Sequence, residues 1–153
     1  MDGFAYAAES LTGKYIGAKN NFQLRISIKY IFRWGWILTI LFTILYYFWG
    51  DQILSLLTNN QSVLEASKPY YKWVLLIPIS GFGAFLWDGV YVGATASKAM
   101  RNAIFIATFG YFILYFLLEP VLGNNALWMA LLLFLLLRGI GMKLMARKYI
   151  YGE

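Results

Sequence analysis

The sequence is organised around residues 70–95, YYKWVLLIPISGFGAFLWDGVYVGAT. About 20 apolar residues cross a hydrocarbon core of roughly 30 Å, so this stretch is long enough to span a bilayer. It nevertheless contains Pro78, four glycines and Asp88. The proline, together with Gly81 and Gly83, predicts a kinked or locally unwound helix. An ionised side chain at membrane depth costs on the order of 3 kcal/mol, which makes Asp88 a candidate functional residue.

Two roles are open for Asp88. As a proton or cation site, it would take up a proton from one side of the membrane and release it to the other, because burial disfavours the charged form. As a structural group, it would pair with a buried cation such as Arg138, although Arg138 lies near a helix end and is expected simply to extend to the interface. Helical spacing places Tyr91 and Thr95 on the face of Asp88. Trp87, with Trp73, Phe82 and Phe85, could line a path for flat, lipophilic cations.

The composition excludes several classes of protein. Of 153 residues, 61% are hydrophobic, 20% aromatic and only 13% charged, which is not the composition of a soluble domain. The net charge of +6 comes from basic residues between apolar runs, so it indicates membrane topology and no nucleic-acid partner. The absence of cysteine and histidine excludes disulfides, thiolate metal sites and His-based triads. There is no phosphate-binding loop for ATP, and we expect no enzyme activity and no cofactor beyond a coupling ion, H⁺ or Na⁺.

Outward from residues 70–95, the sequence predicts an all-α membrane protein with four full transmembrane helices and one partial N-terminal helix in a single membrane domain, 1–153. The expected helices are residues 2–16, 34–49, 70–95, 103–118 and 126–142. Gly50 and Asp51 are expected to end the second helix, and residues 51–57 to form amphipathic turns on the surface. Ser62 and Glu65 form a capping-box pattern, which would start a helical segment that leads into the third expected helix.

The first segment is too short and too polar to span a bilayer alone. It carries Asp2 and Glu9 on one face, so we interpret it as part of a membrane helix that faces a bundle interior, with both acids as weaker candidate coupling residues. Two small-xxx-small patterns, 13–17 and 89–93, are typical of close helix packing.

The basic residues predict the orientation. Eleven of the thirteen lysines and arginines fall on one side of the predicted membrane, and only Lys68 and Lys72 on the other. By the positive-inside rule, the C-terminus is cytoplasmic and the loop of residues 51–68 is outside.

Several motifs together resemble one transporter family. They are residues 2–13 (DGFAYAAESLTG), 17–18, 56–58 with Val63, 88–95 (DGVYVGAT), 100–102, 127–128 and 138–140. This set resembles the multidrug and toxic compound extrusion (MATE) family, in particular its DNA-damage-inducible (DinF-like) branch. The resemblance implies the eighth to twelfth helices of such a transporter, the last five of its second six-helix lobe.

The resemblance also implies an activity. It implies a secondary antiporter in the bacterial inner membrane that exchanges H⁺ or Na⁺ for amphipathic organic cations. On this interpretation the chain is a C-terminal fragment, embedded in the lipid bilayer and inactive without its partner, the N-terminal lobe. The resemblance assigns no role to Asp88, which is a candidate on the physical argument alone.

Two alternatives remain. The chain could be a small membrane protein that assembles with a partner and transports nothing, or a lipid-linked sugar flippase of the same superfamily. The flippase would need a wider and more basic cavity lining than residues 70–95 offer.

Overall fold

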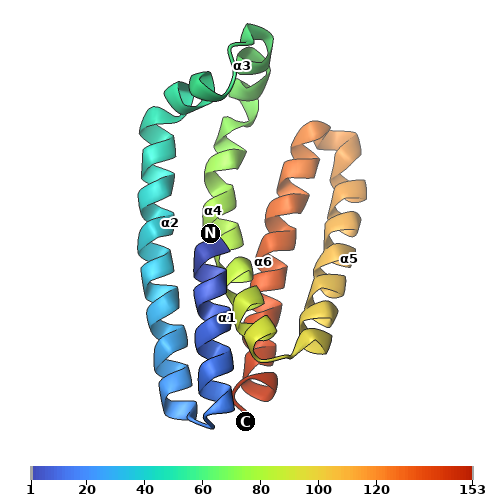
Figure 1. Cartoon of the computed structure of the whole chain (residues 1–153). Coiled ribbons are helices and arrows are strands. Elements are labelled where there is room, and N and C mark those ends of the chain that lie inside the picture. Colours follow the sequence, from blue (N-terminus) through green and yellow to red (C-terminus); the bar gives the residue numbers. More distant parts are fainter. Residues whose placement is uncertain (1, 153) are drawn as a thin grey trace.

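The computed structural model describes residues 2–152, so Met1 and Glu153, the ends of the predicted domain, lie outside it. Within that range the chain is a bundle of helices (Figure 1). The elements are α1 (Asp2–Gly17), α2 (Asn21–Leu57), α3 (Gln61–Ser67), the 3₁₀ turn η1 (Lys68–Tyr70), α4 (Tyr71–Gly93), α5 (Ser97–Leu122) and α6 (Asn124–Tyr149). Four segments of the described chain are long and apolar enough to cross a membrane: α2, α3 to α4, α5 and α6. The predicted class, an all-α membrane protein with four spans and a shorter first helix, is confirmed.

Three of the spanning helices, α2, α5 and α6, are longer than the apolar windows that predicted them, whereas α4 is slightly shorter than the predicted range 70–95. The window 34–49 is only the middle of α2, because the basic segment before it and the turns after it are also helical. A straight helix of 37 residues would measure about 55 Å, well beyond a core of roughly 30 Å. The helix bends at Trp49, whose φ of −119° and ψ of 15° are not helical. The chain therefore changes direction next to Gly50, where the sequence predicted the end of the span.

The bend in α2 is tied to the start of α4. A kink leaves backbone carbonyls of the preceding turn without their usual helical donors. The hydroxyl of Tyr71, the first residue of α4, donates a hydrogen bond to the carbonyl of Tyr46, one turn before Trp49. This contact links the C-terminal part of α2 to the first turn of α4.

Two local expectations need correction. The predicted cap at Ser62 is wrong: helix α3 is capped by Asn60, since the Asn60 side-chain oxygen accepts from the Ser62 backbone N–H at 3.0 Å. For Pro78 the sequence predicted a kink or a local unwinding, and the unwinding does not occur, because α4 is helical from Tyr71 to Gly93. The irregular turn lies earlier, at η1, where Pro69 takes one of the first positions and costs no helical hydrogen bond.

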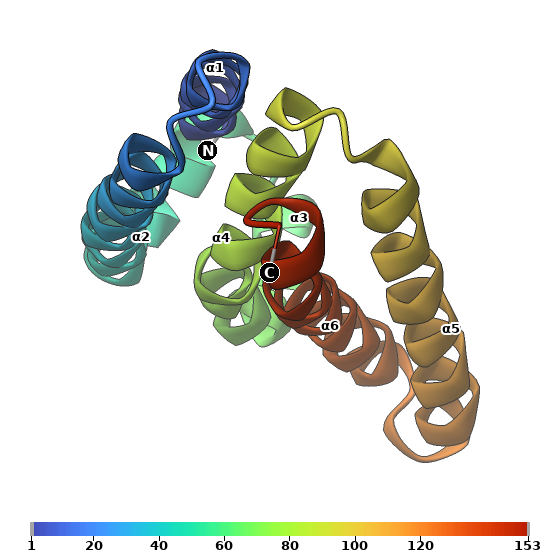
Figure 2. The ribbon, with the colours of Figure 1, turned by 90° about the horizontal axis from the view of Figure 1, so that it is seen from below.

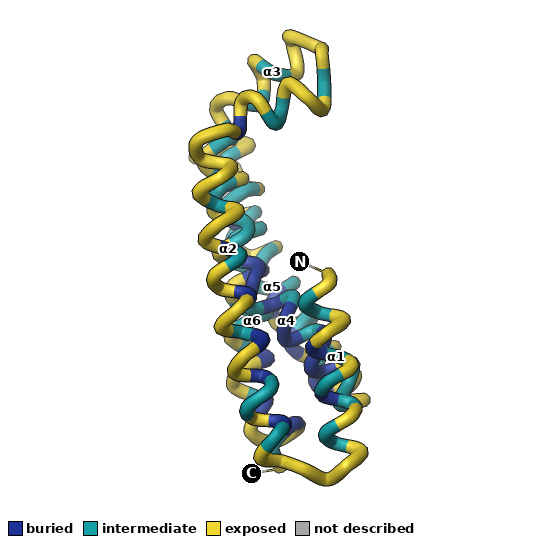
Figure 3. The backbone as a smooth tube through the Cα atoms, turned by 60° about the vertical axis from the view of Figure 1, so that its left-hand side comes forward, coloured by how far each residue is buried: buried dark blue, intermediate teal, exposed yellow. Residues whose placement is uncertain are grey.

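Helix α4 lies at the centre of the bundle and packs on its neighbours with different faces (Figures 2 and 3). Toward α2, Phe82 and Leu86 close on Gly35, where an added Cβ would collide with the Phe82 ring. Toward α1, Gly89 and Gly93 lie so close that a Cβ on either would overlap backbone carbonyls of that helix. The close-packing interpretation of the 89–93 pattern agrees with this contact, whereas a Cβ at Gly17 of the 13–17 pattern would meet nothing.

The third neighbour of α4 is α6, and α5 packs against α6. An added Cβ at Gly139 of α6 would lie 3.0 Å from the Ala84 backbone nitrogen, so these helices also approach closely. Helices α5 and α6 form a hairpin whose buried residues are largely alanines: Ala99, Ala103, Ala107, Ala126, Ala130 and Ala146. Small side chains let the two backbones approach without ordering flexible groups.

Candidate functional site

The central feature of the candidate site is an ion pair between α4 and α6. The Arg138 guanidinium donates from Nη2 to Oδ2 of Asp88, and the two side chains are only 17% and 18% exposed. The expectation that Arg138 extends to the interface is therefore wrong. The close approach at Gly139 brings the two helices together, and a buried carboxylate without a cation would be costly.

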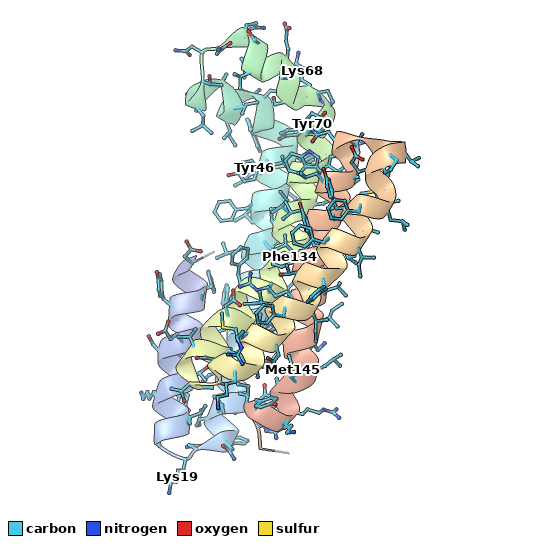
Figure 4. The ribbon with its side chains drawn as sticks, turned by 90° about the vertical axis from the view of Figure 1, so that its right-hand side faces the viewer. Lys19, Tyr46, Lys68, Tyr70, Phe134 and Met145 are labelled. Atoms are coloured by element: carbon cyan, nitrogen blue, oxygen red, sulfur yellow. The ribbon has the colours of Figure 1, made fainter. Side chains whose placement is uncertain are left out.

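The pair leaves part of its hydrogen-bonding capacity unused. Asp88 Oδ1 and Arg138 Nε are buried and have no hydrogen-bond partner among residues 2–152. The guanidinium carbon of Arg138 lies 6.0 Å from the centre of the Phe134 ring, midway along the bundle (Figure 4). One carboxylate oxygen at this depth therefore retains the capacity to accept a proton or contact a cation.

Tyr91 lies, like Asp88, at the contact between α4 and α6, but its phenol already makes a hydrogen bond. The Tyr91 hydroxyl is buried and donates to the Met142 carbonyl of α6 at 2.7 Å. Thr95, the third polar group expected on this face, lies beyond the end of α4 in an exposed turn with a φ of 54°. Its hydroxyl donates to the carbonyl of Ala94 at 2.7 Å, so it does not join the other two.

We expect Tyr91→Phe to destabilise the protein by about 1 kcal/mol, because it removes one buried hydrogen bond while keeping the ring. The measurement is the midpoint of SDS-induced unfolding, followed by helical circular dichroism. Tyr149→Phe, which changes a half-exposed phenol on α6, is the matched control. An equal loss of stability in both variants would contradict the structural role of the Tyr91 hydroxyl.

The two acids of α1 lie apart from Asp88. Gly89 and Gly93 face α1, whereas the Asp88 side chain reaches α6, so α4 separates Asp88 from that helix. Glu9 is half-buried, with its backbone carbonyl against Gly93, and Asp2 is exposed at the start of α1. Within residues 2–152 there is no group of three or more His, Cys, Asp or Glu side chains that could hold a metal ion.

A cavity of about 470 Å³ lies between α2, α4 and α6. Trp87 lines it, with Phe82, Phe32 and Trp36. The Phe32 ring centre lies 5.1 Å from that of Trp87, and the Trp36 ring centre 4.8 Å from that of Phe82. Trp73 and Phe85 are not among its lining residues, and the Trp73 indole donates instead to Asn125 at 2.9 Å. Of the four aromatic residues predicted to line a path for cations, only Phe82 and Trp87 therefore line this cavity.

Sequence reasoning missed the charged end of this cavity. Arg25 and Lys29 of α2 and Lys143 of α6 line it beside the aromatic wall, and within residues 2–152 no acidic residue does. The cavity looks apolar when its lining is inferred from residues 70–95 alone. Its basic residues lie outside that stretch, on α2 and α6, which are more than 100 residues apart in the sequence. The available signal was the helical spacing of Arg25 and Lys29, which puts both on one side of α2.

Comparison with known proteins identifies the family. Residues 1–121 match the MatE family model. The chain is 37% identical over 149 residues to DNA damage-inducible protein F of Escherichia coli (strain K12), an alignment that covers 97% of this chain and 32% of that protein. The chain thus spans about a third of the length of this curated relative, and no solved structure gives a significant match. Because the family model covers most of the sequence and four of its helices can span a bilayer, this chain is a multi-pass membrane protein that belongs to the MatE family.

Proposed function

We propose that this chain works as the C-terminal part of a secondary active multidrug efflux transporter that exchanges H⁺ or Na⁺ for organic cations. The MatE match and the similarity to the E. coli protein support efflux as the activity. The observation that carries the coupling is the Asp88–Arg138 pair, which places a carboxylate with one unpartnered oxygen at membrane depth. On this proposal the chain has no enzymatic activity, and it needs an N-terminal lobe to transport.

The proposed coupling step is a change of charge at Asp88. Protonation of the carboxylate, or contact of Na⁺ with Oδ1, weakens its attraction to Arg138. The contact between α4 and α6 then becomes less favourable relative to an arrangement in which α6 and α5 have shifted. A coupling ion that binds the two arrangements unequally shifts their populations, which is what exchange across the membrane requires.

The proposed location is the bacterial inner membrane with the C-terminus in the cytoplasm. The α1–α2 turn, the α4–α5 turn and the C-terminal end of α6 lie at one end of the bundle (Figure 1). Lys19 lies at this end and Lys68 at the opposite one (Figure 4). The concentration of basic residues at the first end supports a cytoplasmic assignment for it.

The test is Asp88→Asn in the complete gene product that contains this chain, reconstituted in proteoliposomes. We expect ethidium efflux driven by an imposed H⁺ or Na⁺ gradient, measured per molecule of inserted protein, to be abolished, because asparagine cannot change its charge. Glu65→Gln, which neutralises an exposed acid on α3, should leave efflux intact.

A second variant separates coupling from structure. Asp88→Asn combined with Arg138→Gln removes both charges, so it leaves no unpaired arginine at the interface. If the pair couples transport, the double variant stays inactive. Restoration of gradient-driven efflux in the double variant would show that the pair has only a structural role and would refute the coupling proposal.

A further inference from the structure

The cavity between α2, α4 and α6 has two chemically different ends. Arg25 and Lys29 lie in the first turns of α2, and Lys143 lies in the last two turns of α6. Both of these helix ends lie at the end of the bundle that holds the α1–α2 turn (Figure 1). The remaining wall is mainly aromatic and aliphatic side chains, with Trp36 and Ile79 farthest from the charges along their helices. An occupant that matches both ends has an anionic head and an apolar tail.

The dimensions of the cavity match one leaflet of a membrane. Arg25 and Trp36 are eleven residues apart on α2, which corresponds to about 16 Å of helix rise. Half of a hydrocarbon core of roughly 30 Å is about 15 Å. Lys143 lies nine residues, or about 14 Å of helix rise, beyond Phe134, which is midway along the bundle (Figure 4), so a charged group held at Lys29 and Lys143 would lie near headgroup depth while its tail followed the aromatic wall toward the bilayer centre.

The cavity opens onto the bundle surface. Its lining includes Ile79, Leu136 and Ile140, which are 39%, 44% and 53% exposed on that surface. Arg25 is held at the charged end by its position over the Tyr151 ring, 4.6 Å from the ring centre. The charged end is thus preformed, and the apolar end is bordered by exposed aliphatic side chains of the kind that face lipid.

We propose that this cavity binds an anionic phospholipid of the adjacent leaflet, with the phosphate at Lys29 and Lys143 and one acyl chain between α2, α4 and α6. The three basic residues repel organic cations, so this site is separate from any path for cationic cargo. The proposal rests on the lining residues alone and does not depend on the transport function proposed above.

The test uses native mass spectrometry of the 153-residue chain released from nanodiscs. The probes are phosphatidylglycerol and phosphatidylcholine with identical acyl chains. We expect one phosphatidylglycerol to be retained and phosphatidylcholine to be lost. Lys29→Gln with Lys143→Gln should weaken retention by about 10- to 30-fold, since each basic residue near an anionic headgroup raises the affinity by about three- to five-fold. Lys98→Gln with Lys148→Gln removes the same charge outside the cavity and should retain the lipid.

An uncharged variant tests the apolar end. Gly83 lines the cavity, and an added Cβ there meets no atom within 4 Å, so Gly83→Leu fills the space without a clash at its first atom. We expect it to reduce phosphatidylglycerol retention while the chain still folds by circular dichroism. Equal retention of both lipids, equal losses in the two lysine double variants, or full retention in a folded Gly83→Leu variant would overturn the proposal. Displacement of the lipid by millimolar inorganic phosphate alone would also overturn it, because it would identify a free-anion site.

Discussion

Replacing Arg138 with alanine is expected to destabilise the protein by about 3–5 kcal/mol, because it leaves the buried Asp88 carboxylate without its cation. The same reasoning applies to Asp88→Ala, which leaves the buried Arg138 guanidinium without its carboxylate partner. Both side chains are more than four-fifths buried, so water cannot replace the lost partner fully. The measurement is SDS-induced unfolding in mixed micelles, followed by helical circular dichroism.

The double variant Asp88→Ala with Arg138→Ala is the control for this prediction. It removes both charges, so we expect it to be more stable than either single variant, and the thermodynamic cycle gives the interaction energy of the pair. Single variants whose effects simply add would contradict a buried pair, since they would mean that each charge is solvated independently of the other.

The second large effect is expected at the contact between α1 and α4. Gly89→Ala should cost about 1–3 kcal/mol, because the new Cβ overlaps the Ala5 backbone carbonyl and one of the helices must move. Gly89→Leu should undock α1 altogether. Undocking will show as faster tryptic cleavage after Lys14 and Lys19, the basic residues around the α1–α2 turn.

Gly83→Ala is the matched control on the same helix. Its Cβ would meet nothing within 4 Å, and alanine is favoured over glycine inside a helix by up to about 1 kcal/mol. We therefore expect unchanged or slightly increased stability and unchanged cleavage. A Gly89→Ala variant as stable as Gly83→Ala would contradict the close approach of α1 and α4.

Much of the fold can be predicted from hydropathy. Each spanning helix contains an apolar stretch of the required length, and a bilayer leaves an isolated apolar segment few alternatives to a helix. The helix ends could not be predicted in this way. Residues 21–33 of α2 are basic and half-polar, and they stay helical because Leu24, Ile28 and Ile31 are buried in the bundle. At Pro78 the sequence left a kink and a local unwinding open, and it could not exclude the unwinding, because the loss of one backbone donor is compatible with both.

The candidate site could be predicted only one residue at a time. Asp88 is conspicuous in the sequence because a carboxylate in an apolar run is costly. Its partner, 50 residues away, could be named as an alternative but not chosen, because the choice depends on the approach of α4 to α6 at Gly139. The basic end of the cavity depends likewise on α2 and α6 both packing against α4, which no local pattern encodes.

The hairpin of α5 and α6 has a consequence for biosynthesis. Its interior is built from alanines, and α5 packs mainly on α6, with only minor contact to α4 (Figure 2). The two helices follow each other directly through Gly123, so they can pair as soon as both have left the ribosome. The insertion machinery could release α5 and α6 into the lipid as a paired hairpin. Docking of this hairpin onto the helices made earlier would then need mainly one new interface, between α6 and α4.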